Sequence, residues 1–242
     1  MDIKESDMKE IGIIGSGAIG SAIARLAVKA DFTVVIANSR GPESLTDLID
    51  ELGPNARAGT VQDAATFGDL VVLAVPLSSY SNLPVDSLAG RTILSTGNYY
   101  PYRDGRIAQL DALETTTAEY EQSLLPHTHI VKAFNNIVAH HIPLLAHSEP
   151  RTALPVAGDD VAAKKDVSSV VHAVGFDTVD AGTLAESWRF EPESGAYTEI
   201  YAANQEGFSK DFLADRGAPV TADRLRELLA ASHRPDVAAR QF

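Results

Sequence analysis

The chain has 242 residues, of which 45% are hydrophobic, and its formal net charge is -13 at pH 7. Such a chain can bury a full core as one large domain or as one domain plus an extension. The acidic balance argues against nucleic acids and anionic membranes as partners, and no apolar run reaches the ~18 residues of a membrane span. The absence of cysteine excludes disulfides, thiolate catalysis and Cys-ligated metals. Because residues 1–10 are charged and unlike a signal peptide, we expect a cytoplasmic protein.

A complete GxGxxG pattern follows the first predicted strand, residues 11–14, and opens a segment with helical apolar spacing. In this strand-turn-helix context, Gly15 allows a tight turn and Gly17 lets the backbone approach a pyrophosphate. Gly20 allows the helix to pack closely on the strand, and the helix N-terminus favours an anion. The pattern predicts a dinucleotide-binding turn made of Gly15, Ser16, Gly17, Ala18, Ile19 and Gly20.

The second predicted strand, residues 33–37, ends where an NAD-selective fold usually carries an acidic residue. This chain instead has Asn38, Ser39 and Arg40. A carboxylate would repel a 2′-phosphate, whereas a hydroxyl can donate a hydrogen bond to it and a guanidinium can bind it with charge-assisted bonds. The pattern favours NADP(H) as the cofactor. The alternative interpretation is a polar turn that leads into the next helix.

Strand-like and helix-like patterns alternate along the rest of the chain, which predicts a Rossmann-type α/β fold with a doubly wound, mostly parallel sheet. Further strands are expected over residues 56–59, 70–75, 92–95, 129–133, 154–158 and 176–180. Helices are expected after Pro42 and over residues 61–67, 117–125, 159–174, 197–213 and 221–231. The pattern changes near residues 181–182. We therefore expect an NADP-binding domain over residues 1–182 and a small helical region over residues 183–242, with its last ten residues loosely held.

Polar and aromatic residues follow the predicted strands at the edge where open parallel sheets bind ligands. They are found at residues 76–80, 96–100 and 134–136. This edge suits a planar redox partner beside a nicotinamide. The alternatives are a packed loop at residues 99–101 and a helix cap at residues 135–136.

The sequence assigns no catalytic acid, base or nucleophile, and it contains no nucleophile elbow and no Walker motif. Five histidines lie between His127 and His147. The adjacent pair His140 and His141 must point to different sides, and no carboxylate stands at ligand spacing, so we expect no metal site.

Together these motifs resemble the family of coenzyme F420-dependent NADP oxidoreductases, in which F420 is a deazaflavin. The resemblance runs from Ile11 to about Phe190. It rests on residues 14–20, 37–43, 73–77, 98–101, 103–105, 131–136, 154–160, 180–182 and 188–190. The segment at residues 135–136 looks like a bacterial branch. A lysine of the family's phosphate loop has no counterpart here, because residues 41–43 are Gly, Pro and Glu.

The resemblance implies an oxidoreductase that transfers hydride between NADP(H) and a planar acceptor, with coenzyme F420 as the first candidate. Hydride transfer requires mainly juxtaposition and orientation, so it needs no evident acid-base pair. The 2′-phosphate contacts fall on Ser39 and Arg40. The nicotinamide pocket is expected at Val75, Pro76, Leu77, Asn98 and Asn135, and the acceptor, which Asn98 also faces, is expected at Tyr99, Tyr100 and Asn136.

Three alternatives stay open beside this interpretation. The same module is similar to the NADPH domain of membrane ferric reductases, which favours a flavin or ferric reductase. A small carbonyl or imine reductase is a second alternative, and a non-catalytic NADPH-sensing module is a third. The family also implies a homodimer whose other partner is a small-molecule redox substrate.

Overall fold

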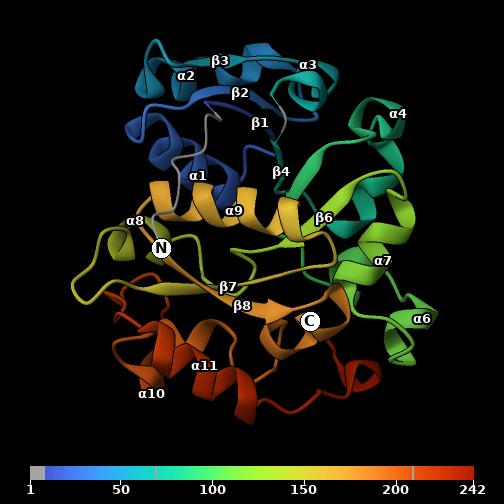
Figure 1. The fold of residues 1–242 in the computed structure, drawn as a ribbon, viewed down its shortest axis with the longest axis vertical. Helices are drawn as coiled ribbons and strands as arrows, with labels where there is room; N and C mark the ends of the chain where they lie inside the picture. The colour runs from blue at the N-terminus through green and yellow to red at the C-terminus, as the bar shows by residue number, and fades with distance from the viewer. Residues whose placement is uncertain (1–8, 69, 209) are drawn as a thin grey trace.

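The computed structural model describes residues 9–68, 70–208 and 210–242. In this part of the chain an eight-stranded sheet has the order β3-β2-β1-β4-β5-β6-β7-β8 (Figure 1). The strands are β1 (Glu10–Ile14), β2 (Thr33–Ala37), β3 (Ala56–Ala58), β4 (Leu70–Leu73), β5 (Thr92–Ser95), β6 (His129–Lys132), β7 (Ala153–Gly158) and β8 (Asp177–Gly182). Strands β1 to β6 are parallel, while β7 pairs antiparallel with β6 and parallel with β8. The predicted mostly parallel Rossmann-type sheet is confirmed.

Helices cover both faces of this sheet. They are α1 (Ala18–Lys29), α2 (Thr46–Leu52), α3 (Val61–Thr66), α4 (Val85–Leu88), α5 (Pro101–Asp104), α6 (Ala108–Asp111), α7 (Thr117–Leu124), α8 (His141–Leu145), α9 (Val161–Ala173), α10 (Gln205–Phe208) and α11 (Ala222–Ala231). Helix α1 packs on β2 and α9 on β5 to β8, within one hydrophobic cluster. Helices α3 and α7 border a second cluster. Strand order reverses between β1 and β4, which places the switch point of the sheet beside α1.

Short polar side chains fix where several helices begin. Thr116 caps α7 by accepting a hydrogen bond from Glu119 N, and the Glu119 carboxylate in turn accepts one from Thr116 N. Asp160 caps α9 by accepting a bond from Ala163 N. These caps satisfy backbone donors that have no partner within the helix.

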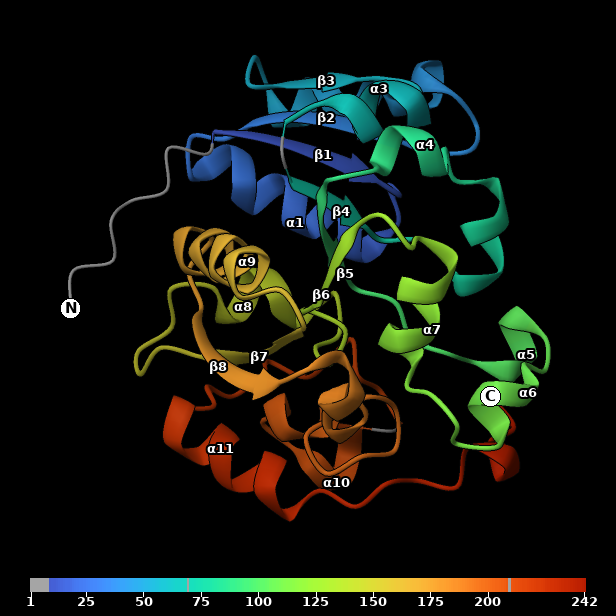
Figure 2. The ribbon, with the colours of Figure 1, turned by 45° about the vertical axis from the view of Figure 1, so that its right-hand side comes forward.

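The segment after residue 182 packs on the far end of the sheet. Figures 1 and 2 show β7 and β8 between α9 and this segment, which carries α11. Phe190, Tyr201, Leu225 and Leu229 of the segment are buried in the same cluster as α1 and α9. The division into two domains at residues 182–183 stays a prediction.

The predicted continuous helix over residues 197–213 is wrong within the described residues, which exclude residue 209. The chain forms a short 3-10 turn at Thr198–Tyr201 and then the single turn α10. The carboxylate of Asp215 accepts hydrogen bonds from Ala203 N and Asn204 N, both at 2.9 Å. These bonds replace the helical partners of the two backbone groups, so the helix ends.

The last ten residues are also held more firmly than predicted. Arg240 is 2% exposed, and its guanidinium donates to Tyr99 O at 2.7 Å and to Pro192 O at 2.9 Å. It also pairs with Glu193 at 2.8 Å. The expectation of a loosely held C-terminal end is therefore wrong at this position. The segment has no apolar pattern that would predict packing, but the polar contacts of Arg240 hold it in place. Across residues 9–68, 70–208 and 210–242, no helix has the length and apolarity to cross a membrane.

Candidate functional site

The glycine-rich turn between β1 and α1 has the geometry of a phosphate cradle. Gly15 has a φ of 112° and lies against Ala74 O, where a Cβ would be 2.2 Å away. A Cβ on Gly20 would stand 1.9 Å from Gly15 O. A Cβ on Gly17 would meet nothing within 4 Å, although this residue is the N-cap of α1. Packing thus requires Gly15 and Gly20, whereas Gly17 leaves open space beside the free N–H groups of the helix.

Asn38 joins the loop after β2 to the glycine-rich turn. Its Nδ2 donates to Ser16 Oγ at 3.0 Å and to Ser44 Oγ at 2.9 Å, and its Oδ1 accepts a bond from Arg40 N. Ser39 and Arg40 are exposed at the tip of this loop. The amide side chain therefore shapes the loop, while the hydroxyl and guanidinium that follow it face solvent.

A shallow pocket of about 310 Å³ lies between this loop and α1. Ser16, Ser21, Arg25, Arg40 and Ser44 are among its lining residues. Arg25 is bound by Glu51 in a bidentate pair with contacts of 2.5 and 2.8 Å. Within the described residues Arg40 has no carboxylate partner, so its charge is available to an anion in the pocket.

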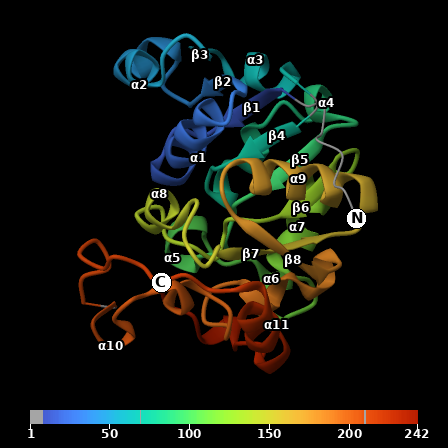
Figure 3. The ribbon, with the colours of Figure 1, turned by 60° about the vertical axis from the view of Figure 1, so that its left-hand side comes forward.

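A second cleft, of about 340 Å³, opens at the carboxyl ends of β1, β4, β5 and β6. It adjoins the N-terminus of α1, which Figure 3 shows beside α8 and above the C-terminal segment. The structure brings many of the predicted residues to its walls. They are Gly17, Ala18, Ile19, Val75, Pro76, Asn98, Tyr100 and Asn135. Predicted cofactor residues from four separate segments thus share one cavity.

Three of the residues predicted for the nicotinamide pocket or the acceptor do not line this cleft. Leu77 is 3% exposed and packs in the core. Tyr99 is buried with its hydroxyl donating to Asp111 Oδ1 at 3.0 Å. Asn136 is fully buried and donates to Ala196 O at 2.9 Å and to Tyr201 Oη at 3.1 Å. For Tyr99 and Asn136, the geometry supports a role in packing the adjacent loops rather than contact with an acceptor.

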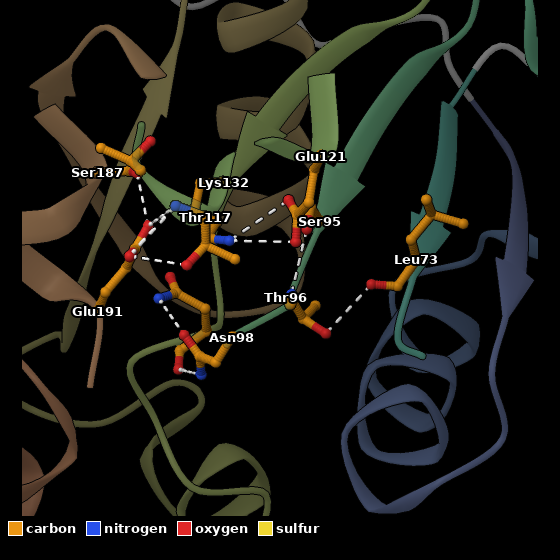
Figure 4. A network of polar contacts seen from close by, with 12 residues as sticks. Leu73, Ser95, Thr96, Asn98, Thr117, Glu121, Lys132, Ser187 and Glu191 are labelled. Atoms are coloured by element: carbon orange, nitrogen blue, oxygen red, sulfur yellow. Dashed lines mark hydrogen bonds and ion pairs between the residues drawn. The ribbon is translucent and has the colours of Figure 1, made fainter. Parts of the chain in front are cut away.

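A buried polar network supports the loop that forms the cleft wall after β5 (Figure 4). Lys132 and Glu121 are both fully buried and form an ion pair at 3.3 Å. Glu121 accepts a bond from Ser95 Oγ at 2.7 Å, and Ser95 Oγ accepts one from Gly97 N at 3.1 Å. A Cβ on Gly97 would lie 2.1 Å from Glu121 Oε1. The network therefore fixes the path of residues 95–98 from the buried side of the loop.

A second buried carboxylate ties α7 to the C-terminal segment. Glu191 accepts hydrogen bonds from Thr117 N at 3.2 Å, from Thr117 Oγ1 at 2.9 Å and from Ser187 Oγ at 2.8 Å (Figure 4). The backbone carbonyl of Phe190, one residue earlier, accepts a bond from Asn135 Nδ2 at 2.9 Å. The C-terminal segment is thus connected directly to the cleft wall after β6.

The C-terminal segment also supplies cleft residues that sequence reasoning missed. Tyr197, Thr198 and Phe212 line the cleft beside Tyr100 and Arg103. The Arg103 guanidinium lies 4.8 Å from the centroid of the Tyr100 ring and donates to Asn98 O at 2.7 Å. Nothing in the sequence marks Tyr197 as a site residue, because it follows no strand and lies far along the chain from the glycine-rich turn.

The groups present fit a dinucleotide with a 2′-phosphate. Free N–H groups at α1, open space at Gly17 and the charge of Arg40 suit its phosphates. In the cleft, Asn135 Oδ1 is buried and has no hydrogen-bond donor among the described residues, so it can accept a bond from a carboxamide. In the part of the chain that the structure describes, no three His, Asp or Glu side chains gather as metal ligands.

Comparison with known proteins is consistent with this site. Residues 10–99 match the family described as NADP oxidoreductase, coenzyme F420-dependent. Metalloreductase STEAP3 of Rattus norvegicus is 32% identical over 184 residues, which cover 75% of this chain and 36% of that protein. The chain therefore spans little more than a third of that relative's length.

Two solved structures resemble the chain over most of their length. A hypothetical protein, SMa0349 from Sinorhizobium meliloti, has a TM-score of 0.69 and 30% identity, covering 76% of this chain and 91% of that one. A protein from Arthrobacter sp. FB24, proposed to be an F420-dependent NADP-reductase, has a TM-score of 0.63 and 25% identity over 74% of this chain and 87% of that one. These findings place residues 10–99, which include the glycine-rich turn, in the family of coenzyme F420-dependent NADP oxidoreductases.

Proposed function

We propose that this protein transfers hydride between NADP(H) and a planar redox acceptor, with the deazaflavin coenzyme F420 as the first candidate. The observation that carries the proposal is the cleft at the carboxyl ends of β1, β4, β5 and β6. It begins at the glycine-rich turn and ends at an aromatic and cationic wall made by Tyr100 and Arg103. A cofactor held at the turn would therefore extend its reactive ring toward that wall.

The chain's own residues divide the binding task. The α1 N-terminus would hold the pyrophosphate and Arg40 the 2′-phosphate, while Val75, Pro76 and Asn135 would border the nicotinamide. When bound, NADPH supplies the hydride. The protein's part is to juxtapose two rings and exclude water, which accounts for a site without a dedicated acid-base pair.

A flavin or ferric complex is the second candidate acceptor. This alternative is favoured by the 32% identity to a metalloreductase, of which this chain matches about a third. The remaining alternatives, a small carbonyl or imine reductase and a non-catalytic NADPH-binding module, use the same cofactor site. They differ in what, if anything, accepts the hydride.

The test is NADPH oxidation by the purified protein with F420, FMN and ferric citrate offered in turn, and with NADH as the control cofactor. We expect turnover with F420 to exceed turnover with the other acceptors, and NADPH to be preferred over NADH. Turnover that is faster with FMN or ferric citrate would replace the deazaflavin assignment. Stoichiometric NADPH binding without oxidation across the panel would contradict an enzyme.

A further inference from the structure

Two tyrosine hydroxyls meet in the cleft, although they lie far apart in the chain. Tyr100 follows β5 and Tyr197 belongs to the C-terminal segment, and both line the cleft. Their hydroxyl groups are hydrogen-bonded to one another. Asn98 Nδ2 lies beside both, 3.3 Å from the Tyr197 hydroxyl and 3.4 Å from the Tyr100 hydroxyl. We refer to Tyr100 and Tyr197 as the hydroxyl pair.

One of the two O–H donors of the hydroxyl pair has no acceptor among the contacts that the described residues make with the pair. Each phenol has a single O–H donor, and only one of the two can donate across the pair. Asn98 approaches as a donor, so it occupies lone pairs and consumes no proton. Among the described residues no further acceptor contacts either hydroxyl oxygen. One O–H of the hydroxyl pair is therefore left to point into the cleft.

The surroundings of the hydroxyl pair polarise its free O–H. The Arg103 guanidinium lies over the Tyr100 ring, 4.8 Å from its centroid, and lines the same cleft, while it also pairs with the Asp104 carboxylate at 2.8 Å. The N–H of Asn98 withdraws electron density from the hydroxyl oxygens, which strengthens the remaining O–H as a donor. A polarised O–H donor suits an acceptor atom on which charge develops during reaction.

We propose that the hydroxyl pair donates a hydrogen bond to the nitrogen or oxygen atom of the acceptor that gains the electron pair when hydride arrives. This inference rests on the proposed function and names its substrate class. The acceptor is an organic two-electron acceptor, a conjugated heterocycle, imine or carbonyl compound, rather than a one-electron metal complex. Tyr197 is accordingly a substrate-contacting residue supplied by the C-terminal segment.

The reaction balances without any further reagent. One C–H bond of the reduced nicotinamide breaks and one C–H bond, or one N–H bond on a flavin, forms on the acceptor, whose displaced π electrons move onto its nitrogen or oxygen. That atom is stabilised by the O–H of the hydroxyl pair and takes its proton from solvent. Burial and the neighbouring Tyr100 raise the pKa of Tyr197 well above its usual value, so the phenol stays protonated at neutral pH. It acts as a hydrogen-bond donor and not as the acid.

The test compares Tyr100→Phe, Tyr197→Phe and the double variant with Tyr102→Phe as the matched control. Tyr102 is 90% exposed and does not line the cleft. We expect the double variant to lose about 10- to 100-fold in kcat with an organic acceptor such as FMN or F420. Each single variant should keep more activity than the double variant, since either hydroxyl can donate the hydrogen bond to the acceptor.

A second readout excludes a merely structural effect. The NADPH dissociation constant, measured by fluorescence titration, and the melting temperature should match those of Tyr102→Phe in all three variants. Unchanged kcat in the double variant, or equal losses in NADPH binding and in kcat, would overturn the inference and leave the proposed function standing. A wild-type protein that oxidises NADPH with no acceptor of the panel would overturn the proposed function itself. A wild type active only with ferric complexes would overturn the substrate class.

Discussion

Asn98 and Asn135 exchange two hydrogen bonds where both residues line the cleft. Asn98 Nδ2 donates to Asn135 O at 2.8 Å, and Asn135 Nδ2 donates to Asn98 Oδ1 at 3.1 Å. The two residues follow the neighbouring strands β5 and β6, so the pair fixes the distance between two cleft walls. Both residues are nearly buried, which leaves little freedom for water to replace these bonds.

Replacing Asn135 by alanine should therefore loosen the cleft. The change removes the donor to Asn98 Oδ1 and to Phe190 O, and it should lower the free energy of unfolding by about 2 kcal/mol. Urea denaturation measures this loss, and NADPH titration should show weaker binding. The control is Asn55→Ala at an exposed position, which should change neither quantity. Equal stability of both variants would contradict the structural role of the pair.

Gly17 and Gly20 should respond to alanine in opposite ways. Gly17 has an ordinary φ of -70° and open space around it, so Gly17→Ala should leave the free energy of unfolding nearly unchanged. Its new methyl group should obstruct the pyrophosphate and weaken NADPH binding by about tenfold or more. Gly20→Ala places a methyl group against Gly15 O and should cost about 2 kcal/mol of stability. Thermal denaturation and NADPH titration of both variants decide the matter; a destabilised Gly17→Ala would refute this division.

Arg40 should determine the preference for the phosphorylated cofactor. In Arg40→Asp a charge-assisted contact is replaced by repulsion, so NADPH binding should weaken by about 1–3 kcal/mol while NADH binding changes little. Arg226→Asp makes the same charge change on α11, away from the pocket, and serves as the control. Calorimetric titration with both cofactors measures the effect. An equal loss for NADPH in both variants would indicate only the general rise in negative charge.

Removing one charge of the buried pair of Lys132 and Glu121 should lower the free energy of unfolding more than removing both charges. Lys132→Met leaves the Glu121 carboxylate buried without its cation, which should cost about 3–5 kcal/mol. The double variant Lys132→Met with Glu121→Leu removes both charges, and it should recover much of that loss. Urea denaturation of the three proteins provides the comparison. A double variant less stable than Lys132→Met alone would show that Glu121 also contributes through contacts separate from the pair.

Asp215 should make stability depend on acid pH. Burial by itself would raise the pKa of Asp215, but hydrogen bonds from Ala203, Asn204 and Gly217 N and the neighbouring His141 lower it to about 2. Because the folded pKa lies below the ordinary value of 3.8, the carboxylate stabilises the fold above that value. This contribution is lost as the pH falls through about 2. Asp215→Asn should flatten the dependence of the unfolding free energy on pH between about 4 and 2, and an unchanged slope would exclude this carboxylate as the cause.

The sheet was predictable because each central strand is a short apolar run bounded by turn residues. Residues 11–14, 34–37 and 70–73 are buried on both faces, so hydrophobicity alone marks them. The helix predicted over residues 197–213 failed because its pattern is local, whereas its end is set by Asp215, which lies beyond the segment. The prediction that the last ten residues are loosely held failed at Arg240 for the same reason, since the partners of Arg240 lie more than forty residues away along the chain.

The sequence by itself determined the parts of the site whose chemistry is local. The glycine-rich turn and the residues Asn38 to Arg40 are short segments whose residue types and spacing indicate what they bind. The structure places them at neighbouring pockets. Only the tertiary structure decided which tyrosines face the cleft: Tyr99 turns into the core, Tyr100 lines the cleft, and Tyr197 joins it from the far end of the chain. The physical reason is that the direction of a loop side chain depends on its packing partners, here Asp111 for Tyr99 and the C-terminal segment for Tyr100, and adjacent letters in a sequence do not encode them.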